Sequence, residues 1–232
     1  MKGFSVYIMK KIIAFLMVIT LALLGVCSCN NRPAGPADDG ILTEEELFAA
    51  VANVAGCTKV VSITKIIEAA DIYSGEYVTV KDGDNLQFTY KYQKKNDKDT
   101  ALETGVTDRI ITVEGSVWLK DGKYSVDNGA TWTTTAPGVT SNDVKMNIAK
   151  DSLKDIKISD DTKSFEAKIA KENASAVFGV EIDADSDVTI KVVTDGSKLR
   201  SVNFSYTSSG VGISVGTSYT YDAQTLDFTP AE

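Results

Sequence analysis

Large apolar side chains alternate with polar ones along much of this 232-residue chain. In the clearest run, Leu86, Phe88, Tyr90 and Tyr92 alternate with Gln87, Thr89, Lys91 and Gln93. Successive side chains of a β-strand point to opposite faces of its sheet, so this period of two places the four large side chains on one face. The pattern predicts strands with one apolar and one polar face.

The same alternation recurs before and after this run. It marks further candidate strands at Ile63, Lys65 and Ile67, at Ile111, Val113 and Val117, at Val188, Ile190 and Val192, at Val202, Phe204 and Tyr206, and at Val211, Ile213 and Val215. Asp-Gly turns at 81–83, 120–122 and 194–197 separate several runs and favour antiparallel hairpins. We therefore predict a mainly β protein of the α+β class, built on one antiparallel sheet.

A helix is expected ahead of the strands, from 43 to about 55. Thr43 is a candidate N-cap, and Glu46 three residues later completes a capping box. Leu42 and Leu47 have the spacing of a hydrophobic staple. This helix presents an apolar stripe that another part of the chain must cover.

A second helix is expected between Ser141 and Lys154, where Val144 and Ile148 lie four residues apart. The apolar face of the sheet also needs a cover. Either a second sheet lies on it, or the sheet curls around the helices and a lipid.

A leader of basic residues followed by an apolar run precedes these elements. It reads MKKIIAFLMVITLALLGVCSC, in which Lys10 and Lys11 precede the apolar run Ile12–Val26. The run suits a secretory signal and is short for a membrane span. Met9 opens a more typical signal than Met1, so the start codon stays open between them.

The end of the leader resembles a lipobox, in which the signal is cut just before a cysteine whose sulfur carries a diacylglycerol. Cys29 is the favoured attachment residue, because Ser28 fits the small-residue position before the cut. Cys27 is the second choice, because it follows the branched Val26. Two or more acyl chains, at about 0.8 kcal/mol per buried methylene, hold a protein at a membrane.

These features divide the chain into three parts. Residues 1–28 are expected to be a lipoprotein signal peptide that is removed, 29–41 the lipidated cysteine and a flexible tether, and 42–232 a single antiparallel β domain with an N-terminal helix. The formal net charge is −8, and the signal contains only basic charges, so its removal leaves a more acidic chain. This charge argues against a nucleic-acid partner.

The composition also restricts the chemistry. The chain contains no histidine, which excludes nucleophiles activated by imidazole and histidine-bearing zinc sites. It also lacks the glycine-rich phosphate-binding motifs. The run Asp183–Asp187 begins like a calcium loop, but Val188 and Thr194 replace the glycine and glutamate that such a loop needs. We expect no enzymatic activity, no metal and no cofactor.

One local motif is sharper than the rest. Ser125, Asp127, Gly129 and Trp132 fit the SxDxGxTW pattern of an Asp-box, in which the aspartate caps a hairpin turn and the tryptophan packs across it. A β-propeller needs several such repeats, and this chain has one copy. We therefore interpret it as a structural hairpin.

The order of elements resembles the LolA/LppX-like superfamily of lipoproteins and lipid carriers. The resembling segments are the helix at 43–55, Val117–Tyr124 before Trp132, and Thr217–Asp222 before Asp227–Pro230. The resemblance implies a curved half-barrel packed on one or two helices, with an apolar cavity and no catalytic residue.

The expected function is that of a membrane-anchored bacterial lipoprotein at the cell membrane or outer membrane, on its extracytoplasmic side. Its concave apolar β face is expected to bind a lipid or another hydrophobic ligand, with Leu86, Phe88, Tyr90 and Tyr92 as the candidate wall. The alternative is an envelope module for protein interaction or adhesion with a filled β core. Neither the ligand, the protein partner nor the oligomeric state follows from the sequence.

Overall fold

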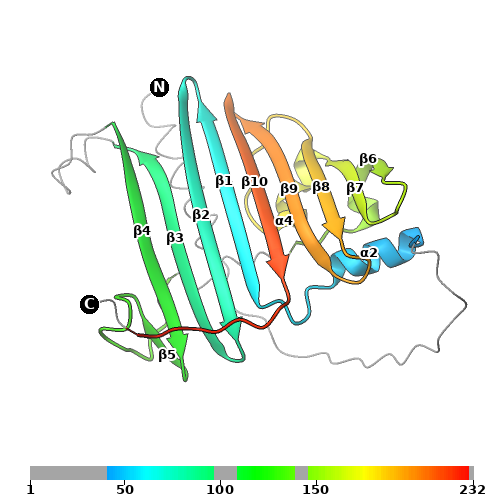
Figure 1. The fold of residues 1–232 in the computed structure, drawn as a ribbon. Coiled ribbons are helices and arrows are strands. Elements are labelled where there is room, and N and C mark those ends of the chain that lie inside the picture. The colour runs from blue at the N-terminus through cyan, green and yellow to red at the C-terminus, as the bar shows by residue number, and fades with distance from the viewer. Residues whose placement is uncertain (1–40, 97–108, 139–145, 230–232) are drawn as a thin grey trace, which may run out of the picture.

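A computed structural model describes residues 41–96, 109–138 and 146–229 of the chain. Over these residues the protein forms a ten-stranded antiparallel sheet, open and curved, with two α-helices (Figure 1). The predicted fold class, a mainly β protein with a curved antiparallel sheet and one or two helices, is confirmed.

The strands alternate in direction across the whole sheet. In chain order the elements are α2 (Glu44–Ala52), β1 (Lys59–Glu68), β2 (Asp71–Asp82), β3 (Asn85–Lys95), β4 (Ile110–Lys120), β5 (Lys123–Ser125), the 3₁₀ turn η1 (Lys150–Ser152), β6 (Leu153–Ile158), β7 (Ser164–Ile169), α4 (Lys171–Phe178), β8 (Val188–Thr194), β9 (Leu199–Ser208) and β10 (Val211–Thr220). In space the strand order is β5-β4-β3-β2-β1-β10-β9-β8-β7-β6.

The first and the last long strands meet in the middle of the sheet. From β1 the chain runs outward through β2, β3 and β4 to β5 at one edge, then resumes at β6 on the far edge and returns through β7, β8 and β9 to β10 (Figure 1). Strand β10 pairs with β1, so that Tyr219 lies opposite Val60 and Ile213 lies opposite Ile66. This central pairing joins segments from the two ends of the described chain into one sheet.

Helix α2 begins with the predicted capping box. The Glu46 N–H donates to Thr43 Oγ1 over 3.3 Å, and the Thr43 N–H donates to Glu46 Oε2 over 3.0 Å. The helix ends at Ala52, sooner than expected, because Asn53 takes an extended backbone conformation. The capping box is confirmed, and the predicted end near residue 55 was too late.

The second predicted helix is wrong over its described part. Residues 139–145 lie outside the described residues; after them, Lys150–Ser152 forms a 3₁₀ turn, and strand β6 begins at Leu153. Leu153 pairs with Ile169 of β7, and this pairing outweighs the weak helical spacing of the segment. The second helix is α4, which ends at Gly179 in a left-handed conformation with φ of 69°.

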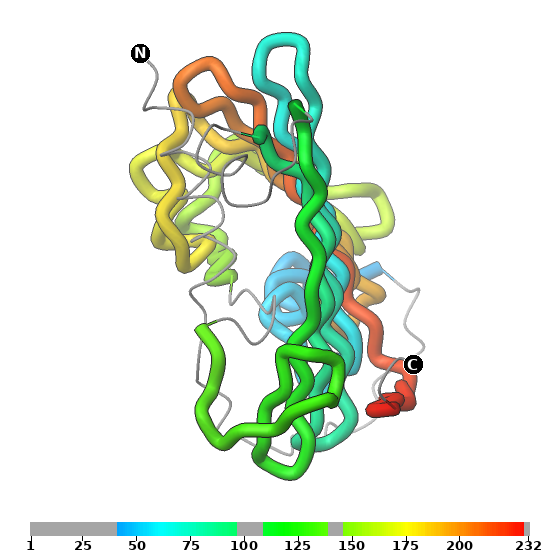
Figure 2. The backbone as a smooth tube through the Cα atoms, turned by 90° about the vertical axis from the view of Figure 1, so that its left-hand side faces the viewer, coloured from blue at the N-terminus to red at the C-terminus, as the bar shows by residue number. Residues whose placement is uncertain are grey.

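Both helices pack on one face of the sheet, which we call the inner face. Phe48 of α2 contacts Phe165 of β7 with ring centroids 5.2 Å apart, and Phe178 of α4 stacks on Phe204 of β9 at 4.1 Å. Figure 2 shows α2 and the region of α4 on the same side of the strands. The main hydrophobic core therefore lies between the helices and strands β7 to β10.

Candidate ligand-binding face

The other half of the inner face is aromatic. Tyr77 of β2 lies opposite Tyr90 of β3, and Phe88 of β3 lies opposite Val117 of β4. The ring centroids of Tyr77 and Tyr92 are 6.2 Å apart, and those of Phe88 and Tyr90 are 5.7 Å apart. We call Tyr77, Phe88, Tyr90 and Tyr92 the aromatic face.

The structure places the predicted wall on this face. Leu86, Phe88, Tyr90 and Tyr92 all point inward and belong to one hydrophobic cluster, which is distinct from the main core. Of these, Phe88 is fully buried and the other three are half-buried. Tyr77 was not predicted, although it belongs to an alternating run on β2 in which Tyr73, Gly75, Tyr77 and Thr79 are the buried residues.

Two glycines let the tyrosine rings lie against the sheet. A Cβ atom at Gly115 would be 2.4 Å from the Tyr90 hydroxyl oxygen, and one at Gly75 would be 2.9 Å from Cε2 of Tyr77. Gly115 is the cross-strand partner of Tyr90, and Gly75 is the cross-strand partner of Tyr92. The rings occupy the space that side chains would take at these two positions.

The inner positions of β1 to β4 carry no charge in the middle of the strands. Charged side chains occur at inner positions only toward the strand ends. Between the ends, the inward residues are Val60, Ser62, Thr64 and Ile66 on β1; Tyr73, Gly75, Tyr77 and Thr79 on β2; Leu86, Phe88, Tyr90 and Tyr92 on β3; and Ile111, Val113, Gly115, Val117 and Leu119 on β4. Burial raises the pKa of Tyr77, and burial followed by the neighbouring Tyr90 raises the pKa of Tyr92. These hydroxyls therefore stay neutral, and the surface is suited to apolar or uncharged ligands.

The Asp-box residues form one hydrogen-bonded turn after β5. The Thr131 hydroxyl and N–H donate to the Asp127 carboxylate over 2.5 and 2.9 Å, and the Ser125 hydroxyl donates to it over 2.7 Å. The Gly129 N–H donates to Ser125 Oγ, and Trp132 Nε1 donates to the Gly129 carbonyl. The two bonds from Thr131, and then that from Ser125, lower the pKa of Asp127 to about 2.

The Asp-box turn is also the docking point of the C-terminal segment. Phe228 packs edge-on against Trp118 at 5.8 Å and against Trp132 at 6.2 Å, and Gln87 donates a hydrogen bond to the carbonyl of Asp227. Figure 1 shows this segment crossing the ends of the central strands from β10 to β5. The geometry gives the four Asp-box residues a structural role in this part of the sheet.

The acidic run after α4 caps a turn. The N–H groups of Ser209 and Gly210 donate to the carboxylate of Asp185 over 2.9 and 3.4 Å, and these bonds help to lower its pKa. Asp187 accepts a hydrogen bond from the Lys171 N–H. Across the ranges that the structure describes, no cluster of three or more acidic, cysteine or histidine side chains is arranged to hold a metal ion.

The candidate lipid-attachment residues Cys29 and Cys27 lie outside the described residues. Cys57 is described; it is half-buried against the main core, and its thiol donates to the Lys59 carbonyl over 3.3 Å. Among the helices in the described ranges, none has the length and apolar character needed to cross a membrane.

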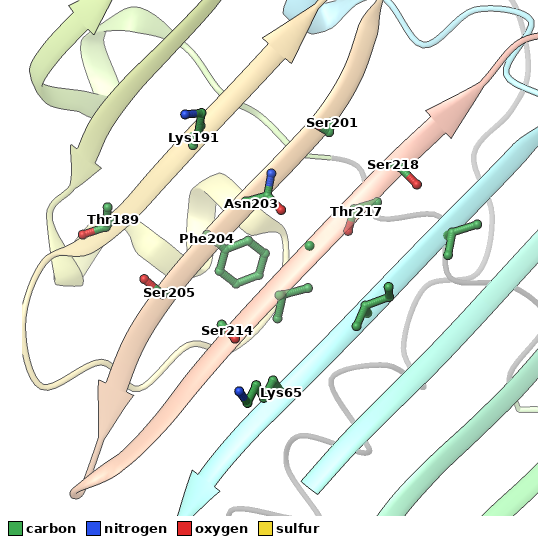
Figure 3. Close-up of a pocket in the computed structure, with 14 residues that line it drawn as sticks. Lys65, Thr189, Lys191, Ser201, Asn203, Phe204, Ser205, Ser214, Thr217 and Ser218 are labelled. Atoms are coloured by element: carbon green, nitrogen blue, oxygen red, sulfur yellow. The ribbon is translucent and has the colours of Figure 1, made fainter. Parts of the chain in front are cut away.

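A shallow groove of about 600 Å³ lies on the outer face, on the side of the sheet away from the aromatic face. Its floor follows β10 over Ser214, Gly216 and Ser218, and its walls include Asn203 and Lys191 (Figure 3). The groove is lined by small and polar side chains together with the apolar Val61 and Ile63 of β1.

Comparisons with known proteins give limited similarity. No protein-family model and no curated sequence matches the chain. Among solved structures, it is similar to LprF from Mycobacterium bovis, with 8% identity over 81% of this chain and 96% of that chain and a TM-score of 0.43. It is also similar to a porin-like protein from Bacteroides uniformis, with 11% identity over 72% and 98% of the two chains and a TM-score of 0.29. Both TM-scores are below 0.5, so neither similarity by itself assigns a family or a function.

Proposed function

We propose that this chain is a bacterial envelope lipoprotein, without enzymatic activity, that binds a lipid or another hydrophobic ligand on the aromatic face. The observation that carries the proposal is the uncharged aromatic cluster of Tyr77, Phe88, Tyr90 and Tyr92 on the inner side of β2 and β3, in which Tyr90 and Tyr92 are half-buried. The lipobox-like leader and the resemblance to lipid carriers in the order of elements support the same class.

The aromatic face has the properties that an acyl chain needs. Aromatic side chains provide large apolar areas, and burying apolar surface contributes about 25 cal/mol per Å². The glycines under the rings let the rings lie close to the sheet. Both helices pack on the main core. Neither Phe48 of α2 nor Phe178 of α4 belongs to the hydrophobic cluster of the aromatic face.

Ligand binding can be tested with purified protein. Native mass spectrometry of protein isolated from membranes should show a co-purifying lipid, and an environment-sensitive apolar dye should bind to the delipidated protein. Tyr92→Ser should weaken dye binding about tenfold, because it removes one ring from the surface. Ile72→Ser is the matched control, because Ile72 is 52% exposed on the outer face of β2. Absence of both lipid and dye binding would reject the proposal.

The membrane anchor is a separate part of the proposal. We expect diacylglycerol on Cys29, so that Cys29→Ser shifts the protein from the membrane fraction to the soluble fraction. Cys27→Ser is the matched control and should leave the protein in the membrane. Mass spectrometry of the mature N-terminus identifies the modified residue, and an unmodified Cys29 would contradict the assignment.

A second candidate function is protein interaction through the edge of the sheet. Strand β5 is short and pairs only with Trp118–Lys120 of β4. Among the described strands, the rest of β4, Ile110–Val117, therefore pairs only with β3 and forms an edge of the sheet. Unpaired edges accept additional strands, and the opposite edge strand β6 carries a bulge between Lys154 and Lys157 that disfavours such pairing.

A photo-crosslinking residue in place of the exposed Thr112 of β4 tests this candidate. It should capture one defined envelope protein in intact cells, whereas the same residue in place of Thr89 on β3 should not. Equal crosslinking from both positions would reject the edge as a specific docking site.

A further inference from the structure

A strip of buried hydroxyl groups separates the main core from the aromatic face. It consists of Ser62 and Thr64 on β1, Thr79 on β2 and Thr217 on β10, all on the inner face and each no more than 5% exposed. Buried hydroxyl groups are normally satisfied by hydrogen bonds. Ser62 and Thr217 satisfy each other, with their oxygens 3.1 Å apart.

Thr64 is the exception in this strip. Its hydroxyl oxygen is buried and has no hydrogen-bond partner, and the residue as a whole is 5% exposed. A buried polar group without a partner costs free energy, which a ligand that supplies the missing hydrogen bond would recover. The unpartnered hydroxyl therefore identifies a specific position for a polar group.

This position adjoins the aromatic face. Gly75 of β2 pairs with Thr64 on one side and with Tyr92 on the other, so the three residues form one row across the inner face. Neighbouring strands are about 4.8 Å apart, which puts Thr64 roughly 10 Å from the backbone of Tyr92. Gly75 contributes no side chain between them, and the ring of Tyr77 covers it. An amphiphile can span this short distance with its polar group on Thr64 and its chain on the rings.

The surrounding residues restrict the charge of that polar group. The residues that face inward around Thr64 are Val215 and Gly75 across the two strand pairs and Ser62 and Ile66 on its own strand, and none carries a charge. A carboxylate or phosphate placed there would lose its hydration without gaining a counter-charge. An uncharged ester or hydroxyl group would lose far less hydration free energy.

We propose that the ligand of the aromatic face is a neutral amphiphile, whose ester or hydroxyl group hydrogen-bonds to Thr64 and whose acyl chain lies on the aromatic face. This inference rests on the proposed function and specifies its ligand class. Thr64 is a specificity-determining residue, because it selects for an uncharged polar group at the end of the chain.

The test uses the delipidated protein and two probes that share an acyl chain. Monopalmitoylglycerol is neutral, and palmitate is an anion at neutral pH and above when free in water. Displacement of a bound apolar dye gives both affinities. The wild-type protein should bind monopalmitoylglycerol at least about tenfold more tightly than ionised palmitate, and Thr64→Val should weaken monopalmitoylglycerol binding about fivefold, the factor expected for one hydrogen bond.

Two further variants act as controls. Thr64→Ser keeps the hydroxyl group and should retain most of the affinity for monopalmitoylglycerol, and Thr89→Val on the exposed outer side of β3 should leave it unchanged. Thr64→Val breaks no hydrogen bond in the ligand-free protein. The melting temperature of this variant should therefore equal or exceed that of wild type.

The outcomes separate this inference from the proposed function. If the wild type binds neither dye nor lipid, the proposed function fails. If it binds monopalmitoylglycerol but Thr64→Val binds it equally well, or if palmitate binds as tightly as the glyceride, lipid binding stands and the assignment of Thr64 is overturned.

Discussion

The ring of Tyr90 lies across β4 over Gly115, its partner in the sheet, so close that a Cβ atom at residue 115 would be 2.4 Å from the Tyr90 hydroxyl oxygen. The cross-strand pair thus consists of a large ring and a residue without a side chain. The ring fills the space that the glycine leaves on the inner face.

Gly115→Ala should displace the Tyr90 ring from the sheet. The new methyl group contacts the far end of a flexible side chain, so we expect a modest loss of stability, about 1 kcal/mol, together with weaker binding of an apolar dye. Denaturant unfolding and dye titration measure the two effects. Gly138→Ala, where no atom lies within 4 Å of the added methyl, should change neither. Unchanged dye affinity in Gly115→Ala would show that the close approach of the Tyr90 ring to Gly115 is not needed for binding.

Asp127→Asn should change how stability depends on pH. The folded-state pKa of about 2 lies below the ordinary value of 3.8, so the stabilisation by the ionised carboxylate is complete above about pH 5 and is lost as the pH falls toward 2. The melting temperature of wild type should exceed that of Asp127→Asn near neutral pH, and the difference should shrink between pH 4 and pH 2. Thermal melts of both proteins across this range measure it. A difference that stays constant with pH would contradict a role for the charge.

Phe228→Ala should loosen the C-terminal segment. The change removes two aromatic contacts, to Trp118 and Trp132, and should destabilise the protein by about 1–2 kcal/mol. These are the two tryptophans of the whole chain, so tryptophan fluorescence reports on this site alone and should shift to longer wavelength. Gln224→Ala, in the same segment but without these ring contacts, is the control. An unshifted spectrum would mean that Phe228 does not shield the indoles.

Thr43→Ala should destabilise the protein by about 1 kcal/mol, because it removes the side-chain acceptor of the capping box at the start of α2. Thr43→Ser retains the acceptor and should stay within a few tenths of a kcal/mol of wild type. Chemical denaturation monitored by circular dichroism compares the two. Equal loss in both variants would show that the methyl group of Thr43, and not its hydroxyl, stabilises the helix.

Features that depend on a few neighbouring residues could be predicted from the sequence. The capping box of Thr43 and Glu46 is one of these, because its donors and acceptors lie within one helical turn. The strands were predictable in the same way, because period-two alternation is a local consequence of β geometry. Helix α4 was missed, since its eight residues contain few large apolar side chains and its packing depends on Phe204 of a distant strand.

The candidate site was predictable only in part. The alternation placed Leu86, Phe88, Tyr90 and Tyr92 on one face, but it could not show which strands would flank them. Tyr77 and the two glycines under the rings join the site only through the pairing of β2 and β4 with β3. No local pattern in the sequence indicates those pairings.

Strand β1 shows most clearly where the sequence alone was sufficient and where it was not. Its alternation identified a strand, but hydrophobicity would have turned Ile63 and Ile67 inward. They are instead 55% and 44% exposed, whereas Ser62 and Thr64 are buried. The pairing of β1 with both β10 and β2 determines which of its side chains point inward, because a shift of the register by one residue would move every side chain to the other face. The sequence by itself determined the strands and caps, through local geometry; tertiary pairing decided which side chains share the inner face, and so placed an unpartnered hydroxyl beside the aromatic face.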